Sequence, residues 1–296
     1  MNNWIGKLRE CLERFFFESC DPRVVPILRI ALGSLLIINT IIWWLDGPLW
    51  FTDAGVLTGA TAQDLNWHER WSLFFSLPST AGVIHVCLAI LLVQSVLLTL
   101  GVASRFQAAC IFVWLVSFHH RNPLICDGED TVFRFLTFLM IFLPLDASWS
   151  LGRRLLGKPY CPPQAADVWA LRLLQFEMAL IYASATCSKF VGQTWQDGTA
   201  LYYVSRMTDH FGRVPLPDWL FSMPWFVHGL TWSVLFIEGS LPIALWWRPT
   251  RMLALSLGIA LHLGIEFTMH LFLFEWVMIV GLLSFLVLPA AQPRQK

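Results

Sequence analysis

Charged residues are scarce in this chain. They make up 14% of its 296 residues, whereas a soluble domain has roughly 25%. Lysine occurs only four times, while 56% of the residues are hydrophobic and 16 are tryptophan. This scarcity excludes an ordinary soluble domain and indicates an integral membrane protein. The formal net charge is zero, so the composition gives no basis for nucleic acid as a partner or for polybasic attachment to a membrane.

The cysteines lack metal-binding or disulfide-framework spacing. There are seven of them without a CxxC pair, so neither a metal knuckle nor a disulfide scaffold is predicted. His262, Glu266 and His270 do repeat at intervals of four residues along one helical face. However, the two histidines lie about 12 Å apart along the axis, too far for one ion to touch both. No metal site is therefore predicted, and we interpret the three residues as a polar stripe that lines a cavity or relays protons.

Long apolar runs predict an all-α membrane fold. The segment from Ala81 to Leu100 has twenty residues without a formal charge, enough to cross a hydrocarbon core of about 30 Å. The predicted fold is a bundle of about eight transmembrane helices behind an amphipathic surface helix at residues 1–20, with the membrane domain at 21–288 and a tail at 289–296. The spans run over residues 24–44, 81–100, 106–118, 131–145, 168–188, 225–247, 252–271 and 275–288.

The distribution of lysine and arginine predicts the orientation. Twelve of these residues fall at the termini and in alternate loops, against five in the other loops. Because positive residues favour the cytoplasmic side, both termini are predicted to be cytoplasmic. Segments 46–79, 119–130 and 189–224 then face the external or lumenal side. Since irregular backbone near lipid must line a cavity or be covered by protein, a polar chamber is expected there.

Lys189 lies where the fifth apolar span ends, and no acidic residue follows or precedes it closely in the sequence. One interpretation is a snorkelling lysine that marks the end of the span. The other is a desolvated amine that acts as a base. Tyr182 lies seven residues earlier on the same face, and Trp195 and the predicted turn at Asp197 and Gly198 follow. These neighbours favour the functional interpretation, with the cavity stripe contributing His262 and Glu266.

The segment from His119 to Asp130 is predicted to form a turn between two spans. Asn122 and Pro123 end one helix, and Asp130 or Thr131 is expected to cap the next. The histidines and Asn122 are candidates for the site in this turn. The alternative is that Asn122 and Asp130 only cap helices and close the loop.

Four motifs in order along the chain resemble one family. They are Phe51-Thr52-Asp53-Ala54-Gly55-Val56-Leu57, Arg121-Asn122-Pro123 with Asp130, Pro144-Leu145 with Trp149-Ser150-Leu151, and Tyr182-Ala183-Ser184-Ala185 leading to Lys189-Phe190 and the run Trp195-Gln196-Asp197-Gly198-Thr199-Ala200-Leu201-Tyr202-Tyr203. From about residue 21 to 288 the chain resembles the HTTM (horizontally transferred transmembrane) domain family. These domains are related to the membrane domain of vitamin K-dependent gamma-carboxylase.

This resemblance implies a membrane enzyme with a reduced, vitamin K-type quinone as its cofactor. Lys189 matches the base that deprotonates the hydroquinone, and His120 and Asn122 match a catalytic stretch. Contacts with the cofactor are expected from residues that share the predicted chamber: Tyr182, His119, Trp195, Asp197, Gly198, His262 and Glu266. The large lumenal domain of the carboxylase has no counterpart after residue 288, so recognition of a peptide by that route is not expected. The alternative function is a non-catalytic membrane partner in the export, maturation or immunity of a secreted peptide or protein.

Overall fold

The computed structural model describes residues 2–17, 24–65, 70–158, 169–207 and 211–286. Within these ranges the backbone is helical without strands, apart from one isolated antiparallel bridge between Gly212 and Met269. The chain forms two compact units, Met1–Leu174 and Gln175–Lys296. The predicted tail at 289–296 and the end of the predicted surface helix lie outside the described residues.

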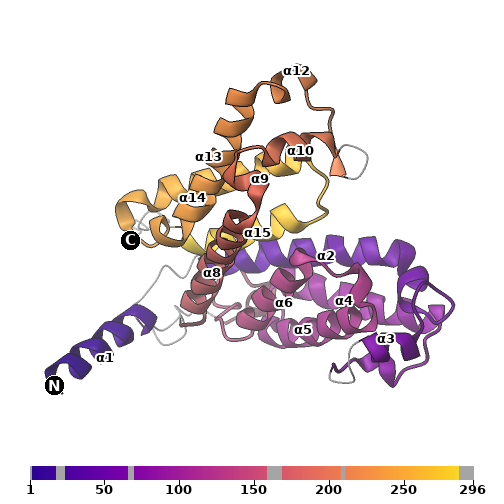
Figure 1. Ribbon diagram of the computed structural model, residues 1–296. Coiled ribbons are helices and arrows are strands. Elements are labelled where there is room, and N and C mark those ends of the chain that lie inside the picture. The colour runs from indigo at the N-terminus through magenta and orange to yellow at the C-terminus, as the bar shows by residue number, and fades with distance from the viewer. Residues whose placement is uncertain (1, 18–23, 66–69, 159–168, 208–210, 287–296) are drawn as a thin grey trace. The chain divides into compact units, whose positions relative to one another are not determined.

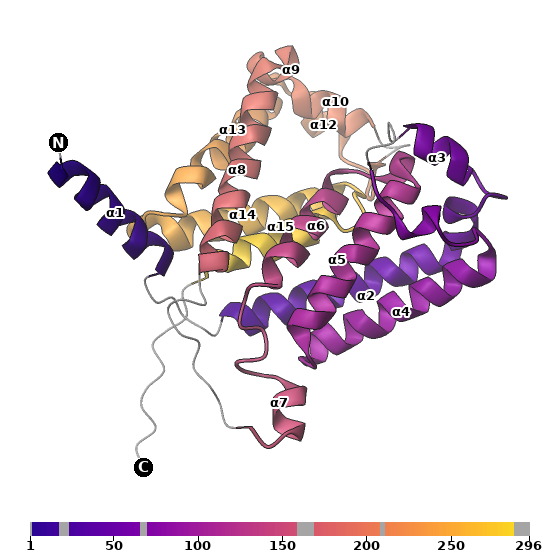
Figure 2. The ribbon, with the colours of Figure 1, turned by 90° about the horizontal axis from the view of Figure 1, so that it is seen from below.

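The first unit is built mainly from three long helices and the shorter α6 (Figure 1). Its elements are α1 (Asn2–Phe17), α2 (Val24–Phe51), α3 (Gly59–Leu65), η1 (Leu73–Phe75), α4 (Ala81–Leu100), α5 (Ser104–Arg121), η2 (Pro123–Ile125), α6 (Gly128–Met140), α7 (Leu151–Leu155) and the start of α8. The helices α2 and α4 lie side by side, and α5 packs against both α4 and α6 (Figure 2).

The ends of α4 follow from its sequence. Thr80 caps the first turn by accepting a hydrogen bond from the Val83 amide, and Gly101 ends the helix in the left-handed region at φ 78°. The pairing of α4 with α2 depends on a small residue. A Cβ at Gly33 would lie 2.3 Å from the Thr99 hydroxyl oxygen, so glycine allows the two helices to approach closely.

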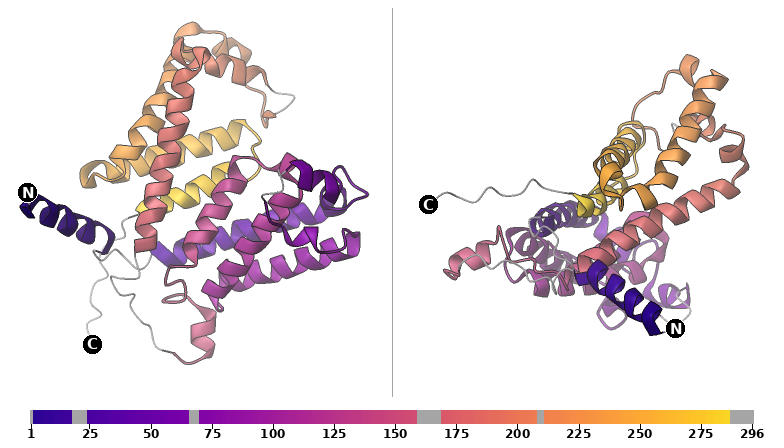
Figure 3. Two further views of the ribbon diagram at one scale, coloured as in Figure 1. Left: turned by 60° about the horizontal axis from the view of Figure 1, so that its bottom comes forward. Right: turned by 90° about the vertical axis from the view of Figure 1, so that its left-hand side faces the viewer.

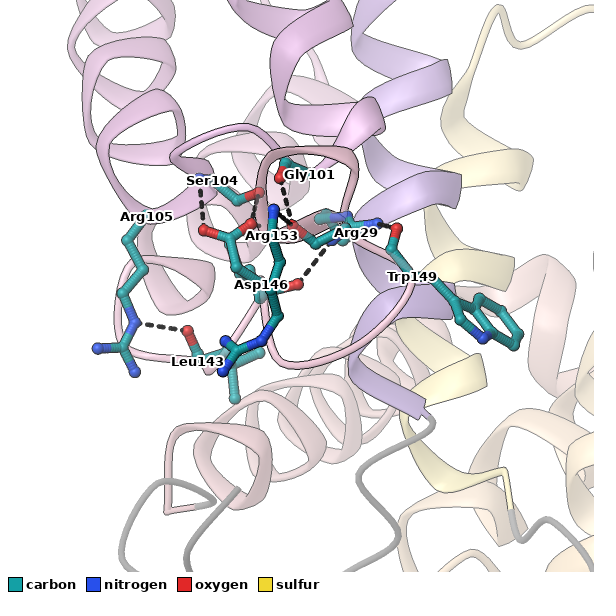
Figure 4. A network of polar contacts seen from close by, with 10 residues as sticks. Arg29, Gly101, Ser104, Arg105, Leu143, Asp146, Trp149 and Arg153 are labelled. Carbon is teal, nitrogen blue, oxygen red and sulfur yellow. Dashed lines mark hydrogen bonds and ion pairs between the residues drawn. The ribbon is translucent and has the colours of Figure 1, made fainter. Parts of the chain in front are cut away.

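Buried Arg29 joins several chain segments at one end of the first unit (Figure 4). Its guanidinium donates to the Leu145 carbonyl at 2.7 Å and to the Trp149 carbonyl at 2.6 Å, and lies 3.9 Å from the Asp146 carboxylate. Asp146 also accepts from the Ser104 amide at 3.0 Å. Four helix ends therefore meet here, one each from α2, α4, α5 and α6. The predicted topology places these four ends on one side of the membrane. A charge inside an apolar span is expected to pair with an acidic residue of another span, but Arg29 mainly binds carbonyl oxygens.

The second unit contains the C-terminal half of the candidate spans (Figure 3). Its elements are α8 (Trp169–Val191, whose first turn belongs to the first unit), α9 (Gln193–Gln196), α10 (Ala200–Arg206), α12 (Asp218–Phe221), α13 (Pro224–Ala244), α14 (Arg248–Thr268), α15 (Phe274–Leu282) and η4 (Leu283–Phe285). The helix α14 packs between α13 and α15, while α10 and α12 lie against α13.

Four helices of the described residues are long and apolar enough to cross a membrane: α2, α4, α13 and α14. The other four predicted spans also fall on helices, α5, α6, α8 and α15, but eight crossings and a surface-bound α1 remain predictions. Several predicted span ends differ from the helix ends, as for α2, which continues to Phe51 rather than ending at residue 44, and α13, which ends at Ala244 rather than residue 247. The helix α6 ends at Met140 rather than residue 145, because Pro144 disfavours helix in the residues before it. The helix α14 ends at Thr268, since Met269 pairs with Gly212.

Candidate functional site

Lys189 forms an ion pair with Glu238 in the second unit. Its ammonium Nζ donates to Glu238 Oε2, joining the last turn of α8 to the middle of α13. The Lys189 side chain is 25% exposed and that of Glu238 is 9% exposed, so the pair is largely shielded from water. The Trp195 ring centroid lies 5.4 Å from Nζ, within the range of a cation–π contact. The structure therefore supplies the acidic partner that the neighbouring sequence lacks.

This pairing changes the chemistry available to Lys189. Attraction between the two groups stabilises the ammonium and the carboxylate together. The Lys189 ammonium must first lose a proton before its amine can accept one from another molecule. The Glu238 carboxylate, which already accepts a hydrogen bond from Nζ, is the nearest group that can take this proton. The two residues are therefore a single proton-holding unit, in contrast to the isolated amine that the sequence suggested.

Tyr182, His262 and Glu275 form a second buried group of titratable side chains. The Tyr182 hydroxyl lies 2.5 Å from His262 Nε2, and His262 Nδ1 contacts the Glu275 carboxylate. Their exposed fractions are 2%, 3% and 1%. The two nitrogens of the His262 ring therefore connect the Tyr182 hydroxyl to the Glu275 carboxylate. This buried chain of three side chains, called the relay below, joins α8, α14 and α15.

Small residues bring α8 close to its partners in this unit. A Cβ at Gly239 would lie 3.2 Å from Thr186 Cγ2, and one at Gly281 would lie 2.3 Å from Met178 Sδ. Through these two glycines α8 approaches α13 and α15 closely. Glu238 and Glu275 both act electrostatically on the Tyr182 phenol, so the ion pair and the relay are neighbours.

The predicted polar stripe on α14 divides between two environments. His262 belongs to the relay, whereas Glu266 forms an ion pair with Arg213 at 2.7 Å. His270 lies beyond the helix and its Nδ1 is 3.0 Å from Arg213 Nη2. The Arg213 amide also donates to the Thr268 carbonyl at 3.1 Å. Arg213 thus holds its loop against the end of α14, and its ion pair with Glu266 is one of the contacts that do so.

The second unit also contains an apolar cavity of about 420 Å³. Aliphatic residues of α10, α13 and α14 line most of it, with Phe221 of α12. Ile237 and Leu261 line it directly and are the sequence neighbours of Glu238 and His262. Among the described residues that line the cavity, none is charged and none belongs to the ion pair or the relay.

The turn at Asp197 and Gly198 has a structural explanation. The exposed Asp197 carboxylate accepts from the Thr199 amide at 3.0 Å and from the Thr199 hydroxyl at 2.5 Å. These hydrogen bonds lower the pKa of Asp197. Gly198 has φ 79°, and a Cβ there would lie 3.2 Å from His228 Cα of α13. The turn therefore packs against α13 and directs the chain into α10, as the sequence predicted.

The first unit contains the other candidate residues, including His119. This side chain is 2% exposed, and its Nε2 lies 3.0 Å from Asp130 Oδ1. Its ring is also edge-on to Trp43, with centroids 5.5 Å apart. Asp130 accepts from the Asp127 amide at 3.0 Å, and Asp127 caps α6 in a reciprocal capping box. The prediction that Asp130 or Thr131 caps this helix was therefore wrong, because the N-cap is Asp127.

His120 and Asn122 are held by backbone groups. His120 Nδ1 lies 2.7 Å from the Trp71 carbonyl, and burial lowers the pKa of this imidazole, with Arg134 adding to the effect. Asn122 is fully buried, donates to the Trp50 carbonyl at 2.8 Å and accepts from the Leu124 amide at 3.1 Å. Both amide atoms of Asn122 therefore connect helix ends, which fits the structural alternative.

The candidates fall into separate groups within the two units. Lys189 and Trp195 are together, and Tyr182 is with His262, whereas His119, His120 and Asn122 lie in the first unit. Two acidic residues of the second unit were missed as site residues. Glu238 lies inside the predicted span 225–247, and Glu275 is the first residue of the predicted span 275–288. Their position in apolar segments was the available signal, but sequence spacing did not identify their partners.

The HTTM domain model matches residues 17–288 of the chain. Among curated proteins, the uncharacterized protein YitO of Bacillus subtilis (strain 168) is 30% identical over 130 residues. That alignment covers 41% of this chain and 38% of the length of YitO. No solved structure matches the chain.

Proposed function

Because the chain belongs to the HTTM domain family, related to the gamma-carboxylases, we propose that this membrane protein is an enzyme in which Lys189 and Glu238 remove a proton from a quinol-type lipid. The observation that carries this proposal is the buried set of titratable groups in the second unit. An unpaired charge within a membrane costs roughly 3 kcal/mol or more, so such groups indicate function when they are linked and oriented.

The surroundings of Lys189 suit an apolar aromatic ligand. The Lys189 side chain is 25% exposed, and the Trp195 ring beside it offers a flat apolar surface. The cavity of about 420 Å³ in the same unit has the apolar lining that a lipid tail requires. A bound hydroquinone would supply the reducing equivalents for chemistry with oxygen. These features support Lys189, Trp195 and the cavity wall as the residues that would hold it.

The chain's own groups provide the proton transfers. Displacing water from Lys189 weakens the hydration of the ion pair and favours movement of the Nζ proton to Glu238. The neutral amine can then accept a proton from an acidic hydroxyl. In the neighbouring relay, Glu275 orients His262 so that its Nε2 can accept and return the Tyr182 proton. The relay thereby keeps a proton donor and acceptor close to Glu238 without exposing either to water.

Replacement of Lys189 tests this function. The full chain would be purified in mild detergent, its retained quinones identified by mass spectrometry, and turnover to the oxidised quinone or its epoxide measured with Lys189→Ala and Lys189→Arg. Loss of a general base predicts a decrease of about 100-fold or more in turnover. The matched control is Lys158→Ala, a surface lysine at the end of the α7 region. Unchanged turnover in both Lys189 variants would refute the base assignment.

The alternative function is that of a non-catalytic membrane partner for a secreted peptide. The ion pair supports this alternative as well, because it can have a purely structural role. Lys189 and Glu238 could serve only to hold α8 against α13. In that case Lys189→Met paired with Glu238→Gln should preserve function, while changes in segments 46–79 or 196–224 should impair it. Retention of a peptide, or of bulk phospholipid without quinone, by the purified protein would support this alternative.

A further inference from the structure

A groove of about 370 Å³ lies between α5 and α6 in the first unit. Residues four apart on α5, Phe112 and Val116, form one wall, and Phe135 and Phe138 of α6 form the other. The rings of Phe112 and Phe138 touch, with centroids 5.2 Å apart. Phe135 and Phe138 are 43% and 40% exposed, so in a membrane protein these walls face acyl chains.

One end of the groove carries a positive charge. Arg134 and Thr131 line it there, with His120 opposite on α5. The Arg134 guanidinium donates to the Thr131 hydroxyl at 3.3 Å, a neutral partner on its own helix. Among the described residues, no carboxylate forms an ion pair with Arg134. His120 cannot supply a counter-charge, because an imidazole is either neutral or positively charged.

The order of these groups along the helices gives the groove the polarity of a lipid. Arg134 and Thr131 lie in the first half of α6, near the polar turn at Asp127, whereas Phe138 lies one to two turns further along the helix. A cation at the interface end and aromatic walls toward the hydrocarbon match an anionic headgroup and its acyl chain. Arginine also binds phosphate through two parallel hydrogen bonds, which adds geometric selectivity.

We propose that this groove is a binding site for an anionic phospholipid, with the phosphate on Arg134 and an acyl chain between the aromatic walls. Charge complementarity selects the headgroup, and the surrounding bilayer is the source of the lipid. The site does not depend on the proposed enzymatic function, because none of its residues belongs to the ion pair or the relay.

The test is a titration of the purified full chain with dioleoyl phosphatidylglycerol and dioleoyl phosphatidylcholine, followed by native mass spectrometry. The wild type should prefer phosphatidylglycerol by about fivefold, as expected for one arginine at the membrane surface. Arg134→Gln should abolish that preference and Arg134→Lys should retain part of it. Val116→Trp should fill the groove and reduce the binding of both lipids.

Arg248→Gln is the matched control, because Arg248 is an exposed arginine outside the groove. It should leave the preference unchanged, and circular dichroism should show the same helix content in all variants. The proposal is overturned if Arg134→Gln keeps the fivefold preference, or if Arg248→Gln removes it equally. Competition by sodium oleate at the same concentration as phosphatidylglycerol would also overturn it, since a free carboxylate would then be the preferred occupant.

Discussion

Removing the carboxylate of Glu238 tests whether the ion pair with Lys189 stabilises the second unit. Glu238→Gln keeps the shape of the side chain but leaves the ammonium without its counter-charge. An exposed ion pair contributes about 1 kcal/mol or less, whereas removal of one partner from a buried pair costs about 3–5 kcal/mol. Exposures of 25% and 9% place this pair between these limits. We therefore expect Glu238→Gln to lower the free energy of unfolding by about 2–3 kcal/mol.

A double-mutant cycle separates the pair from other effects of substitution. Lys189→Met alone leaves a carboxylate unpaired and should cost a similar amount. The double variant leaves neither charge, so it should recover at least about 2 kcal/mol relative to the sum of the single variants. Unfolding would be followed by helical circular dichroism in mixed micelles with increasing denaturing detergent. Additive effects of the two substitutions would show that the contact does not contribute, and would remove the basis for treating the residues as one unit.

Three further predictions concern the first unit. Gly101→Ala should lower the free energy of unfolding by about 2–4 kcal/mol, because φ is 78° and a Cβ would lie 2.5 Å from the buried Arg29 guanidinium. The control is Gly157→Ala, where φ is 61° but the space is open, and this change should cost about 1 kcal/mol. Equal losses in the two variants would contradict the steric argument. Burial raises the pKa of Cys126 to about 12, so at pH 8 this thiol should resist iodoacetamide while the exposed Cys11 reacts, as peptide mass spectrometry would show. Burial also raises the pKa of Asp127, so its contribution to the stability of the folded protein is greatest at low pH. The melting temperature of the wild type should therefore exceed that of Asp127→Asn by less as the pH rises from 4 toward 7. A difference that grows with pH would contradict this prediction.

Local signals predicted much of the helical structure. The boundaries of α4 were predicted without error because threonine and glycine caps flank a continuous apolar run. The same was true of the turn at Asp197 and Gly198 and of the break after Arg121, where residue chemistry limits the backbone. By contrast, the end of α6 was placed five residues too far, since apolar residues continue through a turn that precedes Pro144.

Tertiary partners were not predictable in the same way. A tryptophan near the end of an apolar run is typical of the membrane interface, but Trp43 is only 9% exposed and packs against Phe51 and Phe118. Lys189 had no acidic neighbour in sequence, yet its partner lies 49 residues away. Periodicity identifies the face of a helix without specifying which helix covers it, so these pairings depend on packing that no local pattern encodes.

The partner of Lys189 makes the catalytic hypothesis more demanding. A lone desolvated lysine could lose its proton through burial alone, and its neighbours would matter little. A lysine paired with Glu238 must transfer its proton before it can act as a base, so activity would require both residues and their contact. An anchoring lysine has the opposite requirement, because an apolar pair of similar volume can replace an ion pair without loss of stability. The Lys189→Met and Glu238→Gln double variant therefore distinguishes the two roles: recovered stability with lost turnover indicates catalysis, whereas recovery of both indicates a structural anchor.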